Sequence, residues 1–386
     1  MLASNDFDEI RPYCDEEVPK IINRLLVDPV FARVLQNLFG DESKIQEVRE
    51  AMRQTRDVES FQIRFMVPFL ENIIKSSTSG LTVGGLENLE KDKSYLFISN
   101  HRDIVLDSAL LNVEVYRFGF KPTQIAIGSN LLIYQWIEDV SRINRSFIVK
   151  RNIPVRQMLE SSQLLSAYIR QSVINNGNSI WIAQREGRSK DGLDQTSPAL
   201  LKMLNMSNKQ KFVKGFEELT IVPMSISYEI EPCGNEKVAE LLKRQADSSF
   251  QKSEKDDLLS MVSGLKNQKG RIQIQFGAPI GRSVLKSLSK EGNINDRLKR
   301  LAEYIDYQIY TNYQLYPNNY IAYDLYYNCN KYIDHYTIEE QKSFIELTHQ
   351  RLKLVNEDRE EAMDLWLKMY ATPVHSFESS RKSCEE

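Results

Sequence analysis

From about residue 81 to residue 280, the chain alternates short apolar segments, rich in β-branched residues, with longer helical stretches. This alternation limits the possible folds more than any other feature of the sequence. Strands separated by helices of this size favour a mainly parallel sheet with helices on both faces. We therefore predict an α/β fold with central strands at residues 95–98, 124–127, 146–149, 179–183, 220–228 and 271–276.

Helical patterns flank this region on both sides. Before it, apolar residues recur at helical spacing until Gly40, and after Gly281 a helical pattern returns. The sequence thus predicts an N-terminal helical segment (residues 1–78), an α/β domain (79–280) and a C-terminal helical region (281–386). A chain of 386 residues is long enough to bury a substantial core in this arrangement.

Charge and cysteine content narrow the functional classes. The formal net charge is −3, so the chain lacks the overall positive field of a nucleic-acid-binding protein, and we expect no nucleic-acid partner. Cys14, Cys233, Cys329 and Cys384 lack CxxC spacing, which predicts neither a zinc site nor a disulfide framework and favours a reducing cytoplasm. We see no signal peptide, and no run approaches the roughly 18 apolar residues of a membrane span. Any membrane contact is therefore expected to be peripheral.

One of only four histidines, His101, follows the predicted strand 95–98. The carboxyl edge of an open α/β sheet is where ligands bind, and an imidazole near a carboxylate can remove a proton from a hydroxyl. Two aspartates are candidates for that carboxylate. Asp103, three residues after Asn100, has the position of a carboxylate near the amino end of a helix, so we favour Asp107. A surface histidine beside a helix cap would show the same local pattern.

Cations follow the predicted strand 146–149 directly. Lys150 and Arg151 lie within residues 141–158, a stretch that holds five cations and no acidic residue. At the same sheet edge as His101, such a pair suits a dianionic phosphate. A solvated basic face is the alternative interpretation of this stretch.

Two further blocks complete the pattern. After the strand 179–183 comes Gln-Arg-Glu-Gly-Arg-Ser-Lys (184–190), where glycine lets the backbone approach a ligand and the cations add positive charge. Residues 222–228 read Val-Pro-Met-Ser-Ile-Ser-Tyr, a strand with proline near its start, where no ladder hydrogen bond is needed. By itself each block is a common pattern.

Taken in order, the four blocks resemble the glycerophospholipid acyltransferase family, in particular its glycerol-3-phosphate and dihydroxyacetone-phosphate acyltransferase branch. That family carries His-x4-Asp, Phe-Ile-x-Arg, Glu-Gly-x-Arg-Ser and Val-Pro-x-Ser-Ile-Ser-Tyr blocks. The first block here is one residue longer, and the third lacks one residue between glycine and arginine. We expect the first block to turn irregularly, because neither spacing brings the two side chains onto one helix face. The corresponding segments are residues 101–107, 147–151, 186–189 and 222–228.

The resemblance implies a mainly parallel sheet of the glycerol-phosphate acyltransferase type. It implies transfer of an acyl group from a coenzyme A or acyl carrier protein thioester to glycerol 3-phosphate in phospholipid biosynthesis, without metal or other cofactor. His101 would be the general base and Asp107 would orient its ring. The residues that would bind the acceptor and its phosphate are Lys150, Arg151, Glu186, Gly187, Arg188, Ser189 and Lys190.

Several alternatives stay open. Lysophosphatidate is the rival acceptor, and the altered first and third blocks also fit a lipid- or phosphate-binding protein without catalytic activity. Because the acyl product is insoluble, we expect a cytoplasmic protein that works peripherally at the inner face of the membrane. The apolar residues 130–137, followed by the five cations, fit such a contact, although they also fit a buried core helix.

Overall fold

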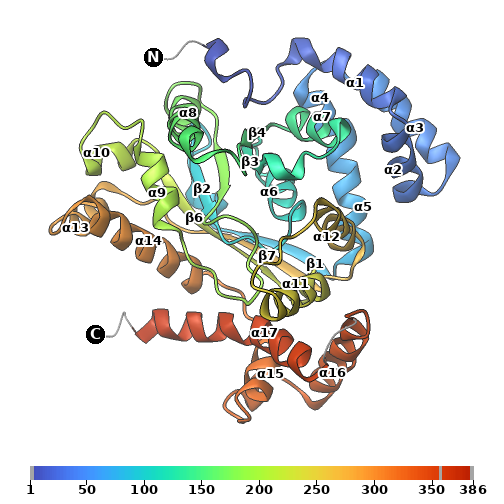
Figure 1. Ribbon diagram of the computed structural model, residues 1–386, viewed down its shortest axis with the longest axis vertical. Helices are drawn as coiled ribbons and strands as arrows, with labels where there is room; N and C mark the ends of the chain where they lie inside the picture. Colours follow the sequence, from blue (N-terminus) through green and yellow to red (C-terminus); the bar gives the residue numbers. More distant parts are fainter. Residues whose placement is uncertain (1–3, 356–358, 383–386) are drawn as a thin grey trace.

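A seven-stranded sheet lies at the centre of the computed structural model, which describes residues 4–355 and 359–382 (Figure 1). The strands run in the order β1-β7-β6-β2-β5-β3-β4, and every neighbouring pair is parallel except β6 with β7. The predicted mainly parallel α/β fold is confirmed. The strands are β1 (Gly80–Gly84), β2 (Leu96–Ser99), β3 (Gln124–Gly128), β4 (Ser146–Val149), β5 (Ile180–Ala183), β6 (Ile221–Tyr228) and β7 (Arg271–Phe276).

All six predicted strands are present, but the sequence did not predict β1. This strand lies at the edge of the sheet and pairs only with β7. Its Leu81 and Val83 are partly buried, and a glycine stands at each end. An edge strand of this composition has a weak apolar pattern, so its pairing depends on β7, about 190 residues further along the chain.

One face of the sheet packs against the N-terminal helices. Phe97 of β2 and Trp181 of β5 point to this face, and Trp136 of α7 packs there as well. Ile137 is buried and Trp136 contacts Phe31, so this part of residues 130–137 belongs to the core. The helices on this side are α1 (Val18–Val27), α2 (Pro29–Phe39), α3 (Glu42–Arg53), α4 (Val58–Phe61), α5 (Val67–Ser77), α6 (Leu106–Arg117) and α7 (Gln135–Ile143).

The opposite face is covered by a second set of helices. Leu96 and Ile98, which alternate with Phe97 along β2, point to this face, as the two-residue period of a strand requires. The helices on this side are α8 (Val155–Ile174), α9 (Pro198–Asn205), α10 (Phe212–Glu217), α13 (Arg282–Leu288) and α14 (Ile294–Thr311).

A third cluster lies below the sheet in Figure 1, where α15 to α17 (orange to red) gather beside α11. Trp366 is fully buried at its centre and contacts Tyr370. The elements are α11 (Gly234–Ala246), α15 (Pro317–Tyr326), α16 (Ile338–Leu352) and α17 (Arg359–Lys382), while α12 (Glu254–Lys266) lies near α5. Helix α14 packs against β6, whereas α15, α16 and α17 pack chiefly against one another and α11. The division of the chain into three parts stays a prediction.

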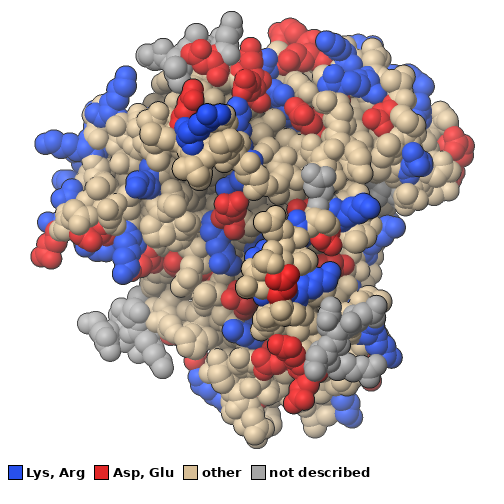
Figure 2. Space-filling view, viewed as in Figure 1, with Lys and Arg blue, Asp and Glu red and all other residues tan. Residues whose placement is uncertain are grey.

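Membrane-spanning helices, cysteines and surface charge can now be compared with the expectations from the sequence for the described residues. Within them, no helix combines the length and apolar character needed to cross a membrane. Cys14, Cys233 and Cys329 are free thiols, and Cys384 lies outside the described residues. Figure 2 shows basic and acidic side chains interspersed over the visible face, as the small net charge leads one to expect.

Candidate active site

His101 lies in the loop that joins the carboxyl end of β2 to the amino end of α6. Its Nδ1 is 2.7 Å from Oδ2 of Asp107, which lies in the first turn of α6. The helix begins only at Leu106, so a loop and not a helix face brings the two side chains together. The His101 side chain is 15% exposed, whereas the Asp107 side chain is fully buried.

Hydrogen bonds keep the Asp107 carboxylate charged. It also accepts from the backbone N–H groups of Arg102 and Asp103, at 2.6 and 3.0 Å, and from the Tyr228 hydroxyl at 2.8 Å. Burial alone would raise the pKa of Asp107, but the contact with His101 and the backbone N–H groups lower it below its usual value. A charged carboxylate at Nδ1 holds a proton there and leaves the lone pair on Nε2.

Asp103 has a different set of partners. Its carboxylate accepts from the backbone N–H groups of Val105 and Leu106, at 2.9 and 2.8 Å, and therefore caps the amino end of α6. The Cys233 thiol donates to the same carboxylate at 3.2 Å. Of the two candidate aspartates, Asp107 is thus the one that contacts the His101 ring.

The loop after β5 meets the His101 loop. The backbone N–H of Ser189 donates to the carbonyl oxygen of His101 at 2.9 Å. Arg188, the residue before it, is 8% exposed, and its Nη1 is buried without a hydrogen-bond partner among the described residues. Gly187 has a φ of +73°, a conformation that glycine adopts without strain. A buried guanidinium N–H without a partner can donate a hydrogen bond to an anionic ligand.

The remaining predicted residues divide into two groups. Arg151 forms an ion pair with Glu186 at 2.8 Å, which joins the ends of β4 and β5 at the same edge of the sheet. Lys150 instead contacts Glu9 at 2.5 Å, and Lys190 contacts Glu240 of α11 at 2.6 Å. Burial lowers the pKa of Lys190, although Glu240 opposes this effect. The structure therefore joins Arg151 to Glu186 in the loop that also carries Arg188 and Ser189, and it pairs the two lysines elsewhere.

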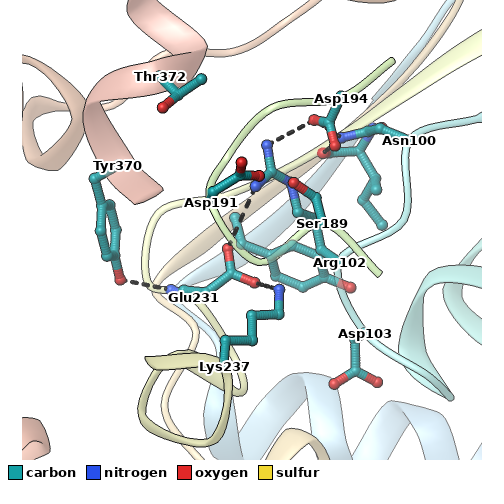
Figure 3. A network of polar contacts seen from close by, with 12 residues as sticks. Asn100, Arg102, Asp103, Ser189, Asp191, Asp194, Glu231, Lys237, Tyr370 and Thr372 are labelled. Atoms are coloured by element: carbon teal, nitrogen blue, oxygen red, sulfur yellow. Dashed lines mark hydrogen bonds and ion pairs between the residues drawn. The ribbon is translucent and has the colours of Figure 1, made fainter. Parts of the chain in front are cut away.

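Several polar residues of the candidate site were not predicted, and Figure 3 shows three of them, Asn100, Arg102 and Asp194. Asn100 and Arg102, the two neighbours of His101 in the chain, both contact the buried carboxylate of Asp194. Tyr228, which ends the fourth block, contacts Asp107. The position of Arg102 beside His101 is a sequence signal that could have been used. No local signal marks Asp194, because it lies 92 residues after Arg102 in the chain.

Comparison with known proteins finds similarity to acyltransferases. Residues 80–227 match the family model described as Acyltransferase. The glycerol-3-phosphate acyltransferase of Pseudomonas fluorescens (strain Pf0-1) is 23% identical over 250 residues, which cover 64% of this chain and 28% of that protein. The enzyme of the same name from Pseudomonas paraeruginosa (strain PA7) is 24% identical over 271 residues, which cover 67% of this chain and 31% of that protein. The chain thus spans less than a third of the length of these relatives.

Among solved structures, one similar chain is the 1-acyl-sn-glycerophosphate (LPA) acyltransferase PlsC from Thermotoga maritima. It is 14% identical, with a TM-score of 0.36, and the match covers 74% of this chain and 92% of that chain.

Proposed function

We propose that the chain moves a fatty acyl group from a coenzyme A or acyl carrier protein thioester to glycerol 3-phosphate, because residues 80–227 match the family model described as Acyltransferase. The product would enter phospholipid biosynthesis. The observation that carries the proposal is the contact between His101 and Asp107, together with the buried, unpartnered Nη1 of Arg188 in the loop that contacts His101 through Ser189. An imidazole base and an anion-binding guanidinium at one sheet edge suit a phosphorylated alcohol as the acceptor.

His101 acts as the general base in this proposal. Its Nε2 takes the proton from the acceptor hydroxyl while the oxygen attacks the carbonyl carbon of the thioester. The C–S bond then breaks, and the leaving thiolate takes the proton back from the imidazolium. Asp107 stabilises the imidazolium that forms between these steps and keeps the ring in the productive tautomer.

Arg188 binds the acceptor phosphate in this proposal, with Arg151 as the second cation at the same edge. Arg151 is paired with Glu186 in the structure, so it must exchange or share that partner when an anion binds. Arg188 has no such competing carboxylate at Nη1. We therefore assign the larger part of acceptor affinity to Arg188.

The test is an acyl-transfer assay with purified full-length chain. Acyl-CoA and acyl carrier protein thioesters are each offered with glycerol 3-phosphate, dihydroxyacetone phosphate and lysophosphatidate, and the acylated product is quantified. We expect glycerol 3-phosphate to be acylated, and His101→Ala to lower kcat by about 10²- to 10⁴-fold. The matched control is His349→Ala, which changes an exposed histidine on α16 and should leave kcat unchanged.

The other outcomes identify the alternatives. Preferential acylation of lysophosphatidate would replace the proposed acceptor and keep the reaction. Retained affinity for glycerol 3-phosphate without turnover, in both the wild type and His101→Ala, would identify a binding protein and contradict the proposed activity.

We also propose that the protein binds the membrane peripherally through the start of α8. Val155, Met158 and Leu159 occupy its first two turns and are 83%, 51% and 59% exposed. They follow Arg151 by a few residues, so this apolar surface stands next to the edge that carries the site. Exposed apolar side chains at the end of a helix are the kind of surface that enters the interface of a bilayer.

Sedimentation with phospholipid vesicles tests this contact. We expect replacement of Val155, Met158 and Leu159 by serine to lower vesicle binding at least about tenfold, since each side chain loses the apolar area that the bilayer would bury. The control replaces Ile338 and Leu354, which are 66% and 69% exposed in the C-terminal region, and should bind as the wild type does. Equal binding of both variants would contradict the assignment.

A further inference from the structure

One carboxylate oxygen holds both chain neighbours of His101. Oδ2 of Asp194 accepts from the Asn100 side-chain amide at 3.2 Å and from the Arg102 guanidinium at 2.7 Å (Figure 3). Asp194 is fully buried, and Arg102 is 6% exposed. The side chains on either side of His101 are therefore held by the same atom.

Further hydrogen bonds hold the loop that carries His101. His101 itself accepts the Ser189 N–H at its carbonyl oxygen, so three consecutive residues contact the segment 189–194. The Asn100 amide also exchanges two hydrogen bonds with the backbone of Ile226 in β6, at 3.0 and 2.8 Å. The loop that carries His101 thus has fixed contacts on two sides.

Asp194 is in turn held by the C-terminal part of the chain. The Tyr313 hydroxyl donates to the same Oδ2 at 2.6 Å, and the Tyr310 hydroxyl donates to the Asp194 carbonyl oxygen. One anionic oxygen therefore receives three donors. The charge on Arg102 compensates the burial of this carboxylate.

We propose that Asp194 is a positioning residue for the acyl transfer, acting on catalysis through His101. This inference rests on the function proposed above. Asp194 contacts neither the His101 ring nor Asp107 in the described structure, so its effect passes through the side chains of Asn100 and Arg102, which flank His101. A misplaced catalytic group, even by about 1 Å, lowers a rate by about 10²-fold.

The first experiment is Asp194→Asn, which keeps the shape of the side chain and removes its charge. We expect kcat to fall about 10- to 100-fold while KM for glycerol 3-phosphate changes less than about threefold, because the Arg188 site is not altered directly. The matched control is Asp191→Asn, which changes a carboxylate in the same loop that accepts a hydrogen bond from the backbone N–H of Leu193. It should leave kcat unchanged.

A double-mutant cycle separates positioning from general destabilisation. If Asp194 acts through His101, Asp194→Asn should not lower the residual rate of His101→Ala any further. A further loss by the same factor as in the wild type would overturn the proposal. If His101→Ala alone leaves the rate intact, the proposed catalytic function fails, and this outcome is distinct from a failure of the Asp194 proposal.

Tyr313→Phe provides the second variant if Asp194→Asn does not fold. It removes one of the three donors to Oδ2 and leaves the ion pair with Arg102 in place. We expect a smaller loss of kcat with the same unchanged KM. An unchanged kcat in a folded Tyr313→Phe would contradict the assignment.

Discussion

At the scale of single residues, four contacts hold the Asp107 carboxylate in the candidate site. Its Oδ2 contacts Nδ1 of His101 and accepts hydrogen bonds from two backbone N–H groups. Its Oδ1 accepts a hydrogen bond from the Tyr228 hydroxyl. Tyr228 comes from the end of β6 and is buried, and this burial, followed by the charge of Asp107, raises its pKa well above the usual value. The hydroxyl therefore stays protonated and donates to Asp107.

Tyr228→Phe should lower both stability and activity. It leaves Oδ1 of Asp107 buried without this donor, which costs about 1–3 kcal/mol of unfolding free energy. The looser carboxylate should also lower kcat by about tenfold. Denaturant titration and acyl-transfer assays measure the two effects. Tyr304→Phe, on α14 away from His101, is the control, and equal behaviour of the two variants would show that the Asp107 contact is not needed.

Arg188→Gln should weaken acceptor binding without destabilising the protein. Because Nη1 of this buried arginine has no partner among the described residues, its removal relieves an uncompensated charge. We expect KM for glycerol 3-phosphate to rise at least about tenfold, as loss of a charge-assisted contact would cause. Glycerol 3-phosphate should raise the Tm of the wild type and not that of the variant. A lower Tm of the unliganded variant would instead indicate a structural role.

At the scale of elements, the loop between β5 and α9 connects the site to α17. Gly192 in this loop has a φ of +79°, and a Cβ there would lie 2.3 Å from the carbonyl oxygen of Met369. That carbonyl is exposed to the loop because Pro373, four residues later in α17, has no N–H to donate to it. The position of the loop therefore depends on a helix from the far end of the chain.

Gly192→Ala should displace this loop. Both the positive φ and the clash with Met369 oppose a side chain, and we expect a loss of about 1–3 kcal/mol in unfolding free energy. Since Ser189 and Asp194 belong to the same loop, kcat should fall as well. Gly281→Ala is the control, because nothing lies within 4 Å of its Cβ position. Similar stability of the two variants in thermal denaturation would contradict this account.

At the scale of the whole molecule, a buried acid couples stability to pH. Asp306 of α14 accepts from the backbone of Thr196 at 2.7 Å, and burial raises its pKa to about 7 despite that hydrogen bond. The folded state therefore binds a proton that the unfolded state releases between about pH 4 and pH 7. The contribution of this proton on Asp306 to the free energy of unfolding is present in full below that range and is lost as the pH rises toward 7.

Asp306→Asn should remove this dependence. The unfolding free energy of the variant, taken relative to that of the wild type, should rise by more than about 1 kcal/mol as the pH increases from 5 to 8. Chemical denaturation of both proteins at several pH values measures the difference. Asp334→Asn, which changes an exposed carboxylate, should show no such trend. A constant difference between Asp306→Asn and the wild type would show that Asp306 is charged throughout the range.

The sequence was most informative where the pattern is local. Each predicted strand alternates or concentrates apolar residues over a few positions, so the sheet and the loops after β2, β4 and β5 could be placed without a structure. It was least informative at β1, whose pattern is weak and whose partner β7 is distant. It also could not show that Lys150 and Lys190 are paired with Glu9 and Glu240.

By itself, the sequence determined the fold class and the sheet edge that carries the loops of His101, Arg151 and Arg188, because parallel strands bring their carboxyl ends to one side. Only the tertiary structure decided which aspartate contacts His101, since the loop before α6 is irregular and no helical period applies to it. It also decided that Asp194 holds the residues on both sides of His101. Such contacts join segments about 90 residues apart in the chain, and a local sequence pattern cannot predict them.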